Sequence, residues 1–530
     1  MAMNSKTAKI SSGYEDMMSR SELIRSGAPA IYQLKPKTQH IGTLKRLTVG
    51  ERSSMKTNKT ILLVGETGTG KSTLINALVN YTMGVKFEDE VWFQVVEDEK
   101  RSQAESQTSD VIVYEIFGFE GKSLPFSLTI VDTPGYGDTR GVEHDAVVSQ
   151  RLFDLFRSED GVHEMNAVGL VLKATENRVS DRMTYIFDSV MSLFGKDLEK
   201  NIIALMTHSY GMPPKNALQA LEAANIKCAK NERNRPVHFL FNNCQAELRD
   251  EDTREDTEVP LENAWRQTTK GMERFSEFLK NIRPQKLKTT VEVLKSQIRL
   301  TASIHNLQER IKLAEKMKDE IKKTQMQLKM HESDLENDKN FTIEVEEQYV
   351  ELEEYSGGWS LFTFDGVTRC TSCKENCHYP GCTVAWTASL CEIMSDGRCT
   401  VCTGKCSDGR HVKDTERYVT KTRKVKKTVG DLKKAYEANV KDTSGLLNVL
   451  EVKKKKLETE GKQWLEEAFR YVLKLRDSAL TVKTMSTQAF LGVLIQKMQE
   501  LGETDKVKTL KEMAGRVDEG SKSVLEKTFG

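Results

Sequence analysis

The segment Gly65–Ser72 constrains the fold of this chain more than any other feature. It reads Gly-Glu-Thr-Gly-Thr-Gly-Lys-Ser, follows the apolar run Ile61–Val64 and precedes a helical pattern over 72–80. A glycine-rich turn between a strand and a helix lets backbone N–H groups surround a phosphate, and the helix N-terminus adds favourable dipole charge. The lysine adds a cation, and the last hydroxyl is a Mg²⁺ ligand. The sequence therefore predicts a nucleoside triphosphate site formed by Gly65, Glu66, Thr67, Gly68, Thr69, Gly70, Lys71, Ser72 and Thr73.

Short apolar runs alternate with longer amphipathic segments through the rest of the first half. The runs are Ile61–Val64, Val111–Ile116, Ser127–Asp132, Ala167–Lys173, Asn201–Thr207 and Val237–Asn242. This alternation predicts an α/β domain over 57–284, with a mostly parallel sheet and helices on both faces. The preceding residues, 1–56, are polar with no clear period, which favours a flexible arm and a short adaptor.

A second phosphate-side element follows the run Ser127–Asp132. It reads Asp-Thr-Pro-Gly from Asp132 to Gly135. Asp132 would hold Mg²⁺ through water, and the N–H of Gly135 would contact the γ-phosphate. Thr108, in Ser-Gln-Thr before another strand, is the candidate for a switch threonine that closes on Mg²⁺; the alternative is an ordinary strand-entry residue. The predicted Mg²⁺ ligands are Ser72, Thr108 and Asp132.

Together these motifs resemble those of a known family. GETGTGKSTLINAL, SQT and DTPGYGDTRG are similar to the septin, Toc and immunity-associated (GIMAP) branch of the P-loop GTPases, over about residues 60–284. The likeness extends more loosely to animal proteins, abundant in fish, that join such a G domain to a helical, cysteine-rich region. The resemblance implies GTP and GDP binding, slow hydrolysis, and dimerisation or polymerisation through the nucleotide face.

One departure from the usual GTPase pattern concerns hydrolysis. Ras-like enzymes place a water-orienting glutamine directly after the Asp-x-x-Gly motif. This chain has Tyr136 there, and a phenol does not orient water as an amide does. We therefore expect slow hydrolysis or groups supplied in trans. Arg140 and Arg178 are candidates for stabilising charge across a dimer, and the alternative is that each is an ordinary surface or structural arginine.

The other departure concerns the base. The stretch Thr207–Gly211 occupies the place of the base-reading element, and Tyr210 stands where relatives tend to carry aspartate. Loss of a carboxylate–guanine pair costs about 1–3 kcal/mol of discrimination, by analogy with other base readout. Tyr210 could still stack on the base and His208 could cover its other face, while Asn242 and Asn243 resemble the second base-side loop. Guanine is the first expectation; relaxed specificity, adenine and a degenerate site remain open.

Eight of the ten cysteines lie between Cys370 and Cys406 and predict a metal module. A Cys-x-x-Cys turn places two thiolates on one ion, and tetrahedral Zn²⁺ takes four such ligands. The expected ligands serve two structural zinc ions, although the spacing leaves their pairing open and disulfides or another metal are alternatives. They are Cys370, Cys373, Cys377, His378, Cys382, Cys391, Cys399, Cys402, Cys406 and His411.

The second half is otherwise helical by pattern. Leucines and other apolar residues recur every seven positions from Leu300, and again from Leu450, which favours a helical hairpin packed within one chain over a dimeric coiled coil. We expect a long helix over 285–356, the cysteine module over 366–412 at its tip, and returning helices over 413–530. Basic runs, including Lys421–Lys427, are interpreted as solvated helix faces, with membrane or nucleic-acid contact as the minor alternative.

Composition limits the function classes. With 79 Lys and Arg against 78 Asp and Glu, the net charge of +1 predicts no general attraction to nucleic acid, and no apolar run has transmembrane length. A cytoplasmic protein is expected. The leading hypothesis is a guanine-nucleotide-binding assembly or switch protein, self-associating through its nucleotide face, with its helical arm or zinc tip available to a protein partner. The alternatives are a zinc-stabilised helical scaffold with a degenerate nucleotide site, and a P-loop ATPase.

Overall fold

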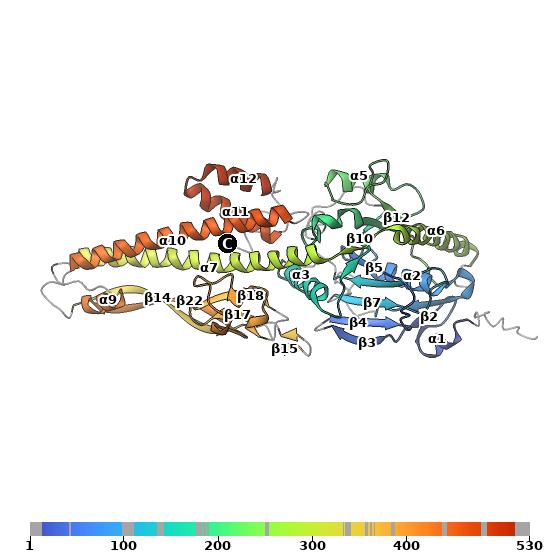
Figure 1. Ribbon diagram of the computed structural model, residues 1–530, viewed down its shortest axis with the longest axis horizontal. Helices are drawn as coiled ribbons and strands as arrows, with labels where there is room; N and C mark the ends of the chain where they lie inside the picture. Colours follow the sequence, from blue (N-terminus) through green and yellow to red (C-terminus); the bar gives the residue numbers. More distant parts are fainter. Residues whose placement is uncertain are drawn as a thin grey trace, which may run out of the picture. The chain divides into compact units, whose positions relative to one another are not determined.

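The computed structural model divides into two compact units, residues 1–294 with 478–485, and 295–477 with 486–530 (Figure 1). Each unit is described by itself. The structure describes residues 13–41, 44–97, 111–134, 142–175, 183, 187, 190–249, 254–331, 333, 341–355, 359–360, 363–364, 366–382, 387–436, 443–478 and 485–514. No helix in these ranges has the length and hydropathy that a bilayer crossing requires.

The first unit is built on an eight-stranded sheet. The strand order is β12-β11-β10-β5-β8-β7-β4-β3, and the pairs are parallel except β7 with β8 and β3 with β4. The central strands are buried along almost their whole length, as expected when helices cover both faces. The α/β fold predicted from the alternating pattern is confirmed. The strands are β3 (Lys37–Ile41), β4 (Leu44–Val49), β5 (Asn58–Gly65), β7 (Ile112–Ile116), β8 (Ser127–Asp132), β10 (Ala167–Lys173), β11 (Ile202–Thr207) and β12 (His238–Leu240).

Helices and short elements complete this unit. One side chain cluster joins α2 and α6 to the sheet through residues such as Leu74, Ile75, Phe275 and Leu279. The helices are α1 (Glu15–Ser19), α2 (Lys71–Met83), α3 (Val142–Arg157), α5 (Lys215–Ala223) and α6 (Arg254–Asn281), with 3₁₀ turns η1 (Phe87–Asp89) and η2 (Lys196–Asn201) and the pair β9 (Glu164–Met165) and β13 (Gln285–Lys286).

The segment before residue 57 differs from the flexible arm expected for it. Over its described part, β3 and β4 extend the main sheet, while β1 (Glu22–Arg25) and β2 (Ala30–Gln33) pair with β6 (Val91–Gln94). Leu44 and Val49, at the two ends of β4, are buried. Of the four positions between them only Leu47 is apolar, so the apolar pattern is too sparse to predict a strand here.

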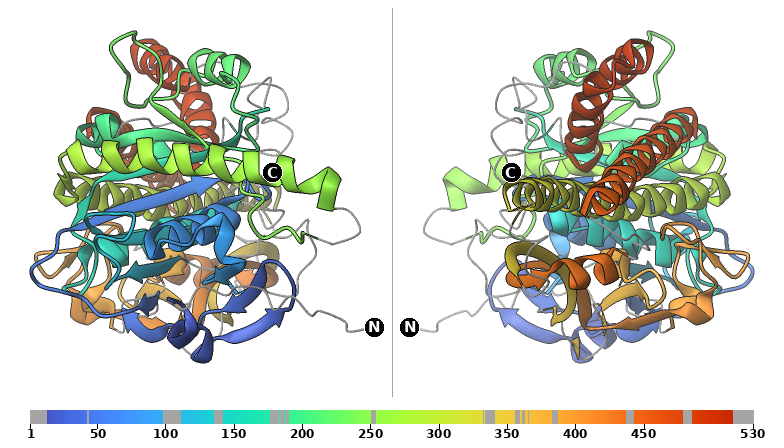
Figure 2. Two further views of the ribbon diagram at one scale, coloured as in Figure 1. Left: turned by 90° about the vertical axis from the view of Figure 1, so that its right-hand side faces the viewer. Right: turned by 90° about the vertical axis from the view of Figure 1, so that its left-hand side faces the viewer.

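The second unit contains two long antiparallel helices, α7 (Lys288–Met330) and α10 (Thr443–Ser478). Ile321 and Leu328 near the end of α7 share an apolar cluster with Leu446 and Leu450 near the start of α10. The seven-residue spacing thus reflects packing within one chain, as predicted. In Figures 1 and 2, α11 (Met485–Glu500) and α12 (Thr504–Ala514) lie on one side of this pair and the strands of the unit on the other.

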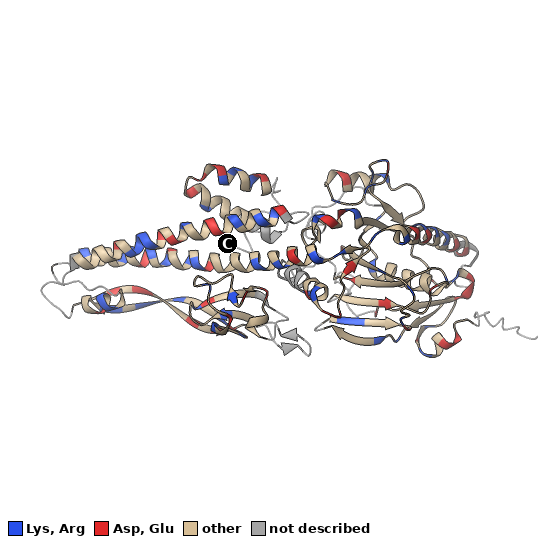
Figure 3. Ribbon diagram, viewed as in Figure 1, with Lys and Arg blue, Asp and Glu red and all other residues tan. Residues whose placement is uncertain are grey.

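The expectation of one helix over 285–356 is wrong, because α7 is followed by a strand. β14 (Thr342–Glu354) pairs with β22 (Glu416–Thr428) in a two-stranded ribbon with thirteen residues in each strand. The run Lys421–Lys427 therefore lies on a strand and not on a helix. It pairs with a stretch of β14 that contains acidic residues, and Figure 3 shows basic and acidic positions along the ribbon. The ion pairs of the ribbon are Arg423–Glu347 at 2.7 Å, Lys427–Glu347 at 2.6 Å, Lys424–Glu344 at 3.5 Å, and Lys421 with Glu351 and Glu353.

The cysteine module lies beside the first half of α7 and not at the tip of the hairpin. The ribbon runs back along the helices and carries the module with it (Figure 1). Arg299 of α7 donates hydrogen bonds to the carbonyl oxygens of Glu392 and Met394, both at 2.7 Å. Asn306 donates to the carbonyl oxygen of Asn376 at 3.2 Å. The elements here are β15 (Trp359–Ser360), β16 (Thr363–Phe364), β17 (Gly366–Cys370), β18 (Glu375–Cys382), η3 (Ala388–Leu390), β19 (Met394–Ser395), β20 (Arg398–Cys399), η4 (Asp408–Arg410), β21 (His411–Asp414) and α9 (Val429–Ala435).

Candidate nucleotide and metal sites

The phosphate loop joins β5 to α2 and depends on its glycines. Gly68 and Gly70 have φ angles of 81° and 86°, a left-handed conformation that L side chains rarely adopt. A Cβ atom on Gly65 would lie 2.4 Å from the carbonyl oxygen of Val171 on the neighbouring strand β10. Thr69 closes the turn, because its hydroxyl donates to the carbonyl oxygen of Glu66 at 2.8 Å. The loop is therefore curled at the end of a buried strand, as a phosphate cradle requires.

Lys71 points back into this loop. Its Nζ donates to the carbonyl oxygen of Gly65 at 2.9 Å and to that of Glu66 at 3.4 Å. The residue is only 8% exposed, and burial lowers the pKa of its ammonium group, while the charges of Asp132 and Glu66 oppose that lowering. A buried cation next to a curled backbone loop is well placed to exchange carbonyl partners for phosphate oxygens.

Asp132 lies one strand away from the loop. It ends β8, is fully buried, and is aligned with Leu63 of β5 in the parallel register. The hydroxyl of Thr133 donates to the carbonyl oxygen of Leu63 at 3.0 Å and so joins the end of β8 to β5. Ser72 lies in the first turn of α2. The remaining residues predicted for this side, Thr108, Gly135, Tyr136, Arg140 and Arg178, lie outside the described residues.

The first base-side loop begins at the end of β11. The Thr207 hydroxyl donates to the carbonyl oxygen of Thr69 at 2.6 Å, which ties this loop to the phosphate loop. His208 has a φ of 53°, and its ring lies so close that a Cβ on Gly70 would be 3.6 Å from its Cε1. Burial, followed by the charge of Lys173, lowers the pKa of His208. The imidazole is therefore neutral at pH 7, which suits contact with a neutral base.

The second base-side loop follows β12 and lies next to the first. The amide of Ser209 donates to the carbonyl oxygen of Phe241 at 2.9 Å. Thr268 of α6 accepts a hydrogen bond from the amide of Asn242 at 2.9 Å and donates to its carbonyl oxygen at 2.7 Å. The Oδ1 of Asn243 lies 3.4 Å from the same hydroxyl. Tyr210, by contrast, is 85% exposed, so the structure does not place its ring over the site.

Comparison with known proteins agrees with this geometry. The family model described as Septin matches residues 56–149, which include the phosphate loop and Asp132. The matched stretch is similar to septins, and the first unit, which contains it, is called the septin-like domain below. Septin-5 of Homo sapiens is 31% identical over 115 residues, covering 20% of this chain and 28% of the relative, and Septin-5 of Mus musculus is 30% identical over the same length. The chain thus spans little more than a quarter of the curated relatives that it matches.

Solved structures are more distant from the septin-like domain. Toc33 from Arabidopsis thaliana, in complex with Mg²⁺ and GMPPNP, is 16% identical with a TM-score of 0.29, and covers 43% of this chain and 88% of its own. LeoA, a bacterial dynamin GTPase from ETEC, is 15% identical with a TM-score of 0.25, and covers 53% and 48%.

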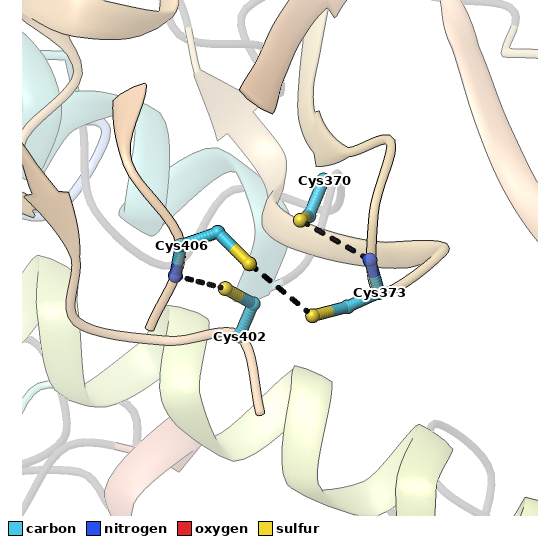
Figure 4. A group of neighbouring side chains, drawn as sticks. All are labelled: Cys370, Cys373, Cys402 and Cys406. Carbon is cyan, nitrogen blue, oxygen red and sulfur yellow. Dashed lines mark hydrogen bonds between the residues drawn. The ribbon is translucent and has the colours of Figure 1, made fainter. Parts of the chain in front are cut away.

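The predicted metal ligands lie outside the septin-like domain, and the structure brings most of them together in groups that could hold a metal ion. The first consists of Cys370, Cys373, Cys402 and Cys406. Figure 4 shows their side chains pointing toward one another from two segments of the module. The Sγ atoms of Cys373 and Cys406 are 3.6 Å apart, too far for a disulfide and close to the roughly 3.8 Å expected between two thiolates on a tetrahedral Zn²⁺.

Backbone amides orient the thiols of this group. The amide of Cys373 donates to the Sγ of Cys370 at 3.3 Å, and that of Cys406 donates to the Sγ of Cys402 at 3.3 Å. Such hydrogen bonds stabilise thiolates, the form that binds metal. The first Cys-x-x-Cys turn is thus completed by Cys402 and Cys406 from the second turn, a pairing that spacing alone left open.

The second group consists of Cys377, Cys399, Cys402 and His411, all buried. Cys402 belongs to both groups, so seven side chains surround two possible metal positions. The thiol of Cys402 lies between these two positions. The Nδ1 of His411 lies 2.9 Å from the carbonyl oxygen of Ser407, which leaves Nε2 for a ligand. That buried Nε2 has no hydrogen-bond partner among the described residues. A metal ion would satisfy it.

The third group consists of His378, Cys391 and Glu392. Glu392 was missed by sequence reasoning because a single glutamate next to a cysteine has no diagnostic spacing. Cys382, also expected as a ligand, ends β18, but its side chain lies outside the described part of the chain. Nine of the ten predicted ligands are thus divided among three groups, where two ions were expected.

Proposed function

We propose that the septin-like domain binds GTP and GDP with Mg²⁺, hydrolyses GTP slowly and acts as a nucleotide-dependent switch or assembly protein. The complete phosphate loop is the observation that supports this most strongly. Lys71 is buried against the loop carbonyls, and Asp132 ends the adjacent strand within the same core. The match to the septin model over residues 56–149 favours guanine over adenine.

The residues have distinct roles in this proposal. Backbone N–H groups from Gly68 to Lys71 surround the β-phosphate, while Lys71 exchanges the Gly65 carbonyl for phosphate oxygens. Ser72 and Asp132, with Thr108, hold Mg²⁺, which neutralises charge on the phosphate oxygens. Gly135 contacts the γ-phosphate and so distinguishes GTP from GDP.

Base recognition combines contacts from both base-side loops. The neutral imidazole of His208 covers one face of the guanine, and Asn242 and Asn243 contribute from the second loop. Tyr210 replaces the usual aspartate, so the pocket lacks a carboxylate for the guanine N–H groups at that position. We expect weaker guanine selectivity than in GTPases that retain the aspartate.

Self-association through the nucleotide face is the proposed output. Arg140 and Arg178 would supply positive charge to the partner's site, which would compensate for Tyr136 in the place of a water-orienting glutamine. The zinc-bound module and the helical pair would serve as the arm that contacts a protein partner. Because thiolate ligands must stay reduced, we place the protein in the cytoplasm.

The test is isothermal titration of the full chain with GTP, GDP and ATP in the presence of Mg²⁺. Lys71→Ala removes the buried cation, and Lys56→Ala, at an exposed lysine in the turn before β5, is the matched control. Selective guanine binding that is lost in Lys71→Ala and kept in Lys56→Ala is expected. Equal binding of ATP, or no binding of any nucleotide, would contradict the guanine assignment.

A second candidate function is a zinc-stabilised scaffold whose nucleotide site is structural or degenerate. The exposed Tyr210 and the dense thiol groups favour it. Light scattering of the purified chain with GDP and with a non-hydrolysable GTP analogue distinguishes the two. A nucleotide-dependent change in oligomer size supports the switch. An unchanged size with tightly bound zinc supports the scaffold.

A further inference from the structure

His378, Cys391 and Glu392 form a compact buried group apart from the two groups that share Cys402. His378 lies on β18, and the other two residues directly follow η3. Their side chains are buried, with exposed fractions of 5%, 3% and 4%. One ligand atom from each lies within 4.8 Å of the other two. Three different donor types therefore converge in a small region of the interior.

The distances suit a tetrahedral ion. The Nδ1 of His378 is 3.1 Å from the Sγ of Cys391 and 3.9 Å from the Oε2 of Glu392. Ligand bonds of 2.0–2.3 Å at tetrahedral angles separate nitrogen from sulfur by about 3.5 Å and nitrogen from oxygen by about 3.3 Å. The observed nitrogen–sulfur distance is shorter than the expected one, and the nitrogen–oxygen distance is longer. Side-chain shifts of about half an ångström would bring both to the tetrahedral geometry.

The electrostatics of the group also favour a cation. A carboxylate and a thiolate taken out of water cost several kcal/mol each unless a positive charge compensates them. A divalent ion supplies that charge to both at once.

We propose that His378, Cys391 and Glu392 bind a third Zn²⁺ ion, so that the module holds three metal ions and not two. Three protein ligands leave one tetrahedral position for water or a further side chain. Nitrogen, sulfur and oxygen donors together suit zinc better than the hard cations Mg²⁺ or Ca²⁺, which select oxygen ligands alone.

The position of this ion gives it a specific structural role. The carbonyl oxygen of Glu392 accepts a hydrogen bond from Arg299 of α7 at 2.7 Å, and that of Met394 accepts another at the same distance. The ion would fix the segment that follows η3 onto β18 and hold both carbonyls toward α7. The two sulfur-rich groups close the module itself, whereas the third ion secures its contact with the helical pair.

This inference rests on the proposal that the module binds zinc. Counting the bound metal ions tests the third site separately from zinc binding by the module as a whole. Zinc bound per full-length chain is measured by mass spectrometry after exhaustive dialysis. Three ions are expected for the native chain and two for Cys391→Ala. Asp396→Asn, an exposed substitution in the turn between β19 and β20, is the control and keeps three. Two ions in both the native chain and Cys391→Ala would overturn the third site, and none would overturn zinc in the whole module.

A second measurement on the native chain covers the case in which the variant does not fold. Replacement of zinc by ¹¹³Cd gives one NMR resonance for each distinct ion, and its position depends on how many sulfur atoms bind it. Three resonances are expected, with one displaced from the other two because it has a single sulfur ligand. Two resonances, both from sulfur-rich sites, would overturn the proposal.

Discussion

The Thr207 hydroxyl donates a hydrogen bond of 2.6 Å to the carbonyl oxygen of Thr69, across 138 residues of sequence. Thr207 ends β11 in the base-side half of the site, and Thr69 belongs to the phosphate loop. The same hydroxyl lies 3.0 Å from the Nδ1 of His208. One buried side chain therefore holds the two halves of the nucleotide site in a fixed relation.

Replacing Thr207 by valine keeps the shape of the side chain and removes this bond. We expect the free energy of unfolding to fall by about 1–3 kcal/mol, because the buried carbonyl of Thr69 loses a donor. Nucleotide affinity should fall as well, since the two loops are no longer held together. Chemical denaturation and titration with GTP measure the two effects. Thr57→Val, at an exposed threonine, is the control. Unchanged affinity in Thr207→Val would show that the bond does not organise the site.

Replacing Tyr210 by aspartate should restore a base-reading carboxylate. The side chain is 85% exposed, so the substitution disturbs no packing. We expect GTP affinity to rise relative to ATP by about tenfold, corresponding to a bidentate pair of 1–3 kcal/mol. Titration of the variant with both nucleotides measures the ratio, and Tyr210→Asn controls for loss of the ring. An unchanged ratio would mean that the base lies elsewhere.

Leu450 tests the packing between the two long helices. It is fully buried in the cluster with Ile321 and Leu328. Leu450→Ala should lower the free energy of unfolding by about 2–5 kcal/mol through lost burial and the cavity left behind. Val452→Ala, two residues along the same helix and 67% exposed, should change it by less than about 0.5 kcal/mol. Denaturation curves followed by circular dichroism provide the comparison. Equal effects would contradict the antiparallel packing.

Glu347 makes the ribbon sensitive to acid. Hydrogen bonds from Lys427 and then Arg423 lower the pKa of its carboxyl below the usual 4.5. Because the pKa of this carboxyl is lower in the folded state, its ion pairs stabilise the fold at pH values above the unfolded-state pKa. That stabilisation is lost as the pH falls through the folded-state pKa. Glu347→Gln should cost at most about 1 kcal/mol at pH 7, because both partners of the ion pair stay partly exposed, and less at an acid pH that protonates the carboxyl. Denaturation at both pH values tests this, with Glu354→Gln as control. A cost that persists in acid would contradict the ion-pair explanation.

The parts of the structure that could be predicted are those that depend on residues close together in the sequence. The phosphate loop needs its glycines and Lys71 within eight consecutive residues, so the pattern alone reveals it. Likewise, the seven-residue spacing of apolar residues predicts the buried face of each long helix, and Leu300 of α7 and Leu450 of α10 are both buried.

The features that escaped prediction depend on distant partners. The run Lys421–Lys427 is a strand because it pairs with acidic residues more than seventy positions earlier, and its charges show no apolar period. Glu392 becomes a candidate ligand only when β18 brings His378 beside it. The edge strand β3 is polar at four of its five positions and buries only Ile41, so its pairing with β4 leaves little mark in the hydrophobic pattern.

The ribbon also has a consequence for how the second unit folds. Arg299 and Glu392 are 93 residues apart, so their contact needs a long loop to close, which is slow. β14 and β22 pair over thirteen residues, and each residue pair that forms brings the two ends of the cysteine module closer together. The long loop is therefore closed in two shorter steps and not in one. Residues at the module end of the ribbon, where Glu354 meets Glu416, should therefore govern the folding rate more than the final stability.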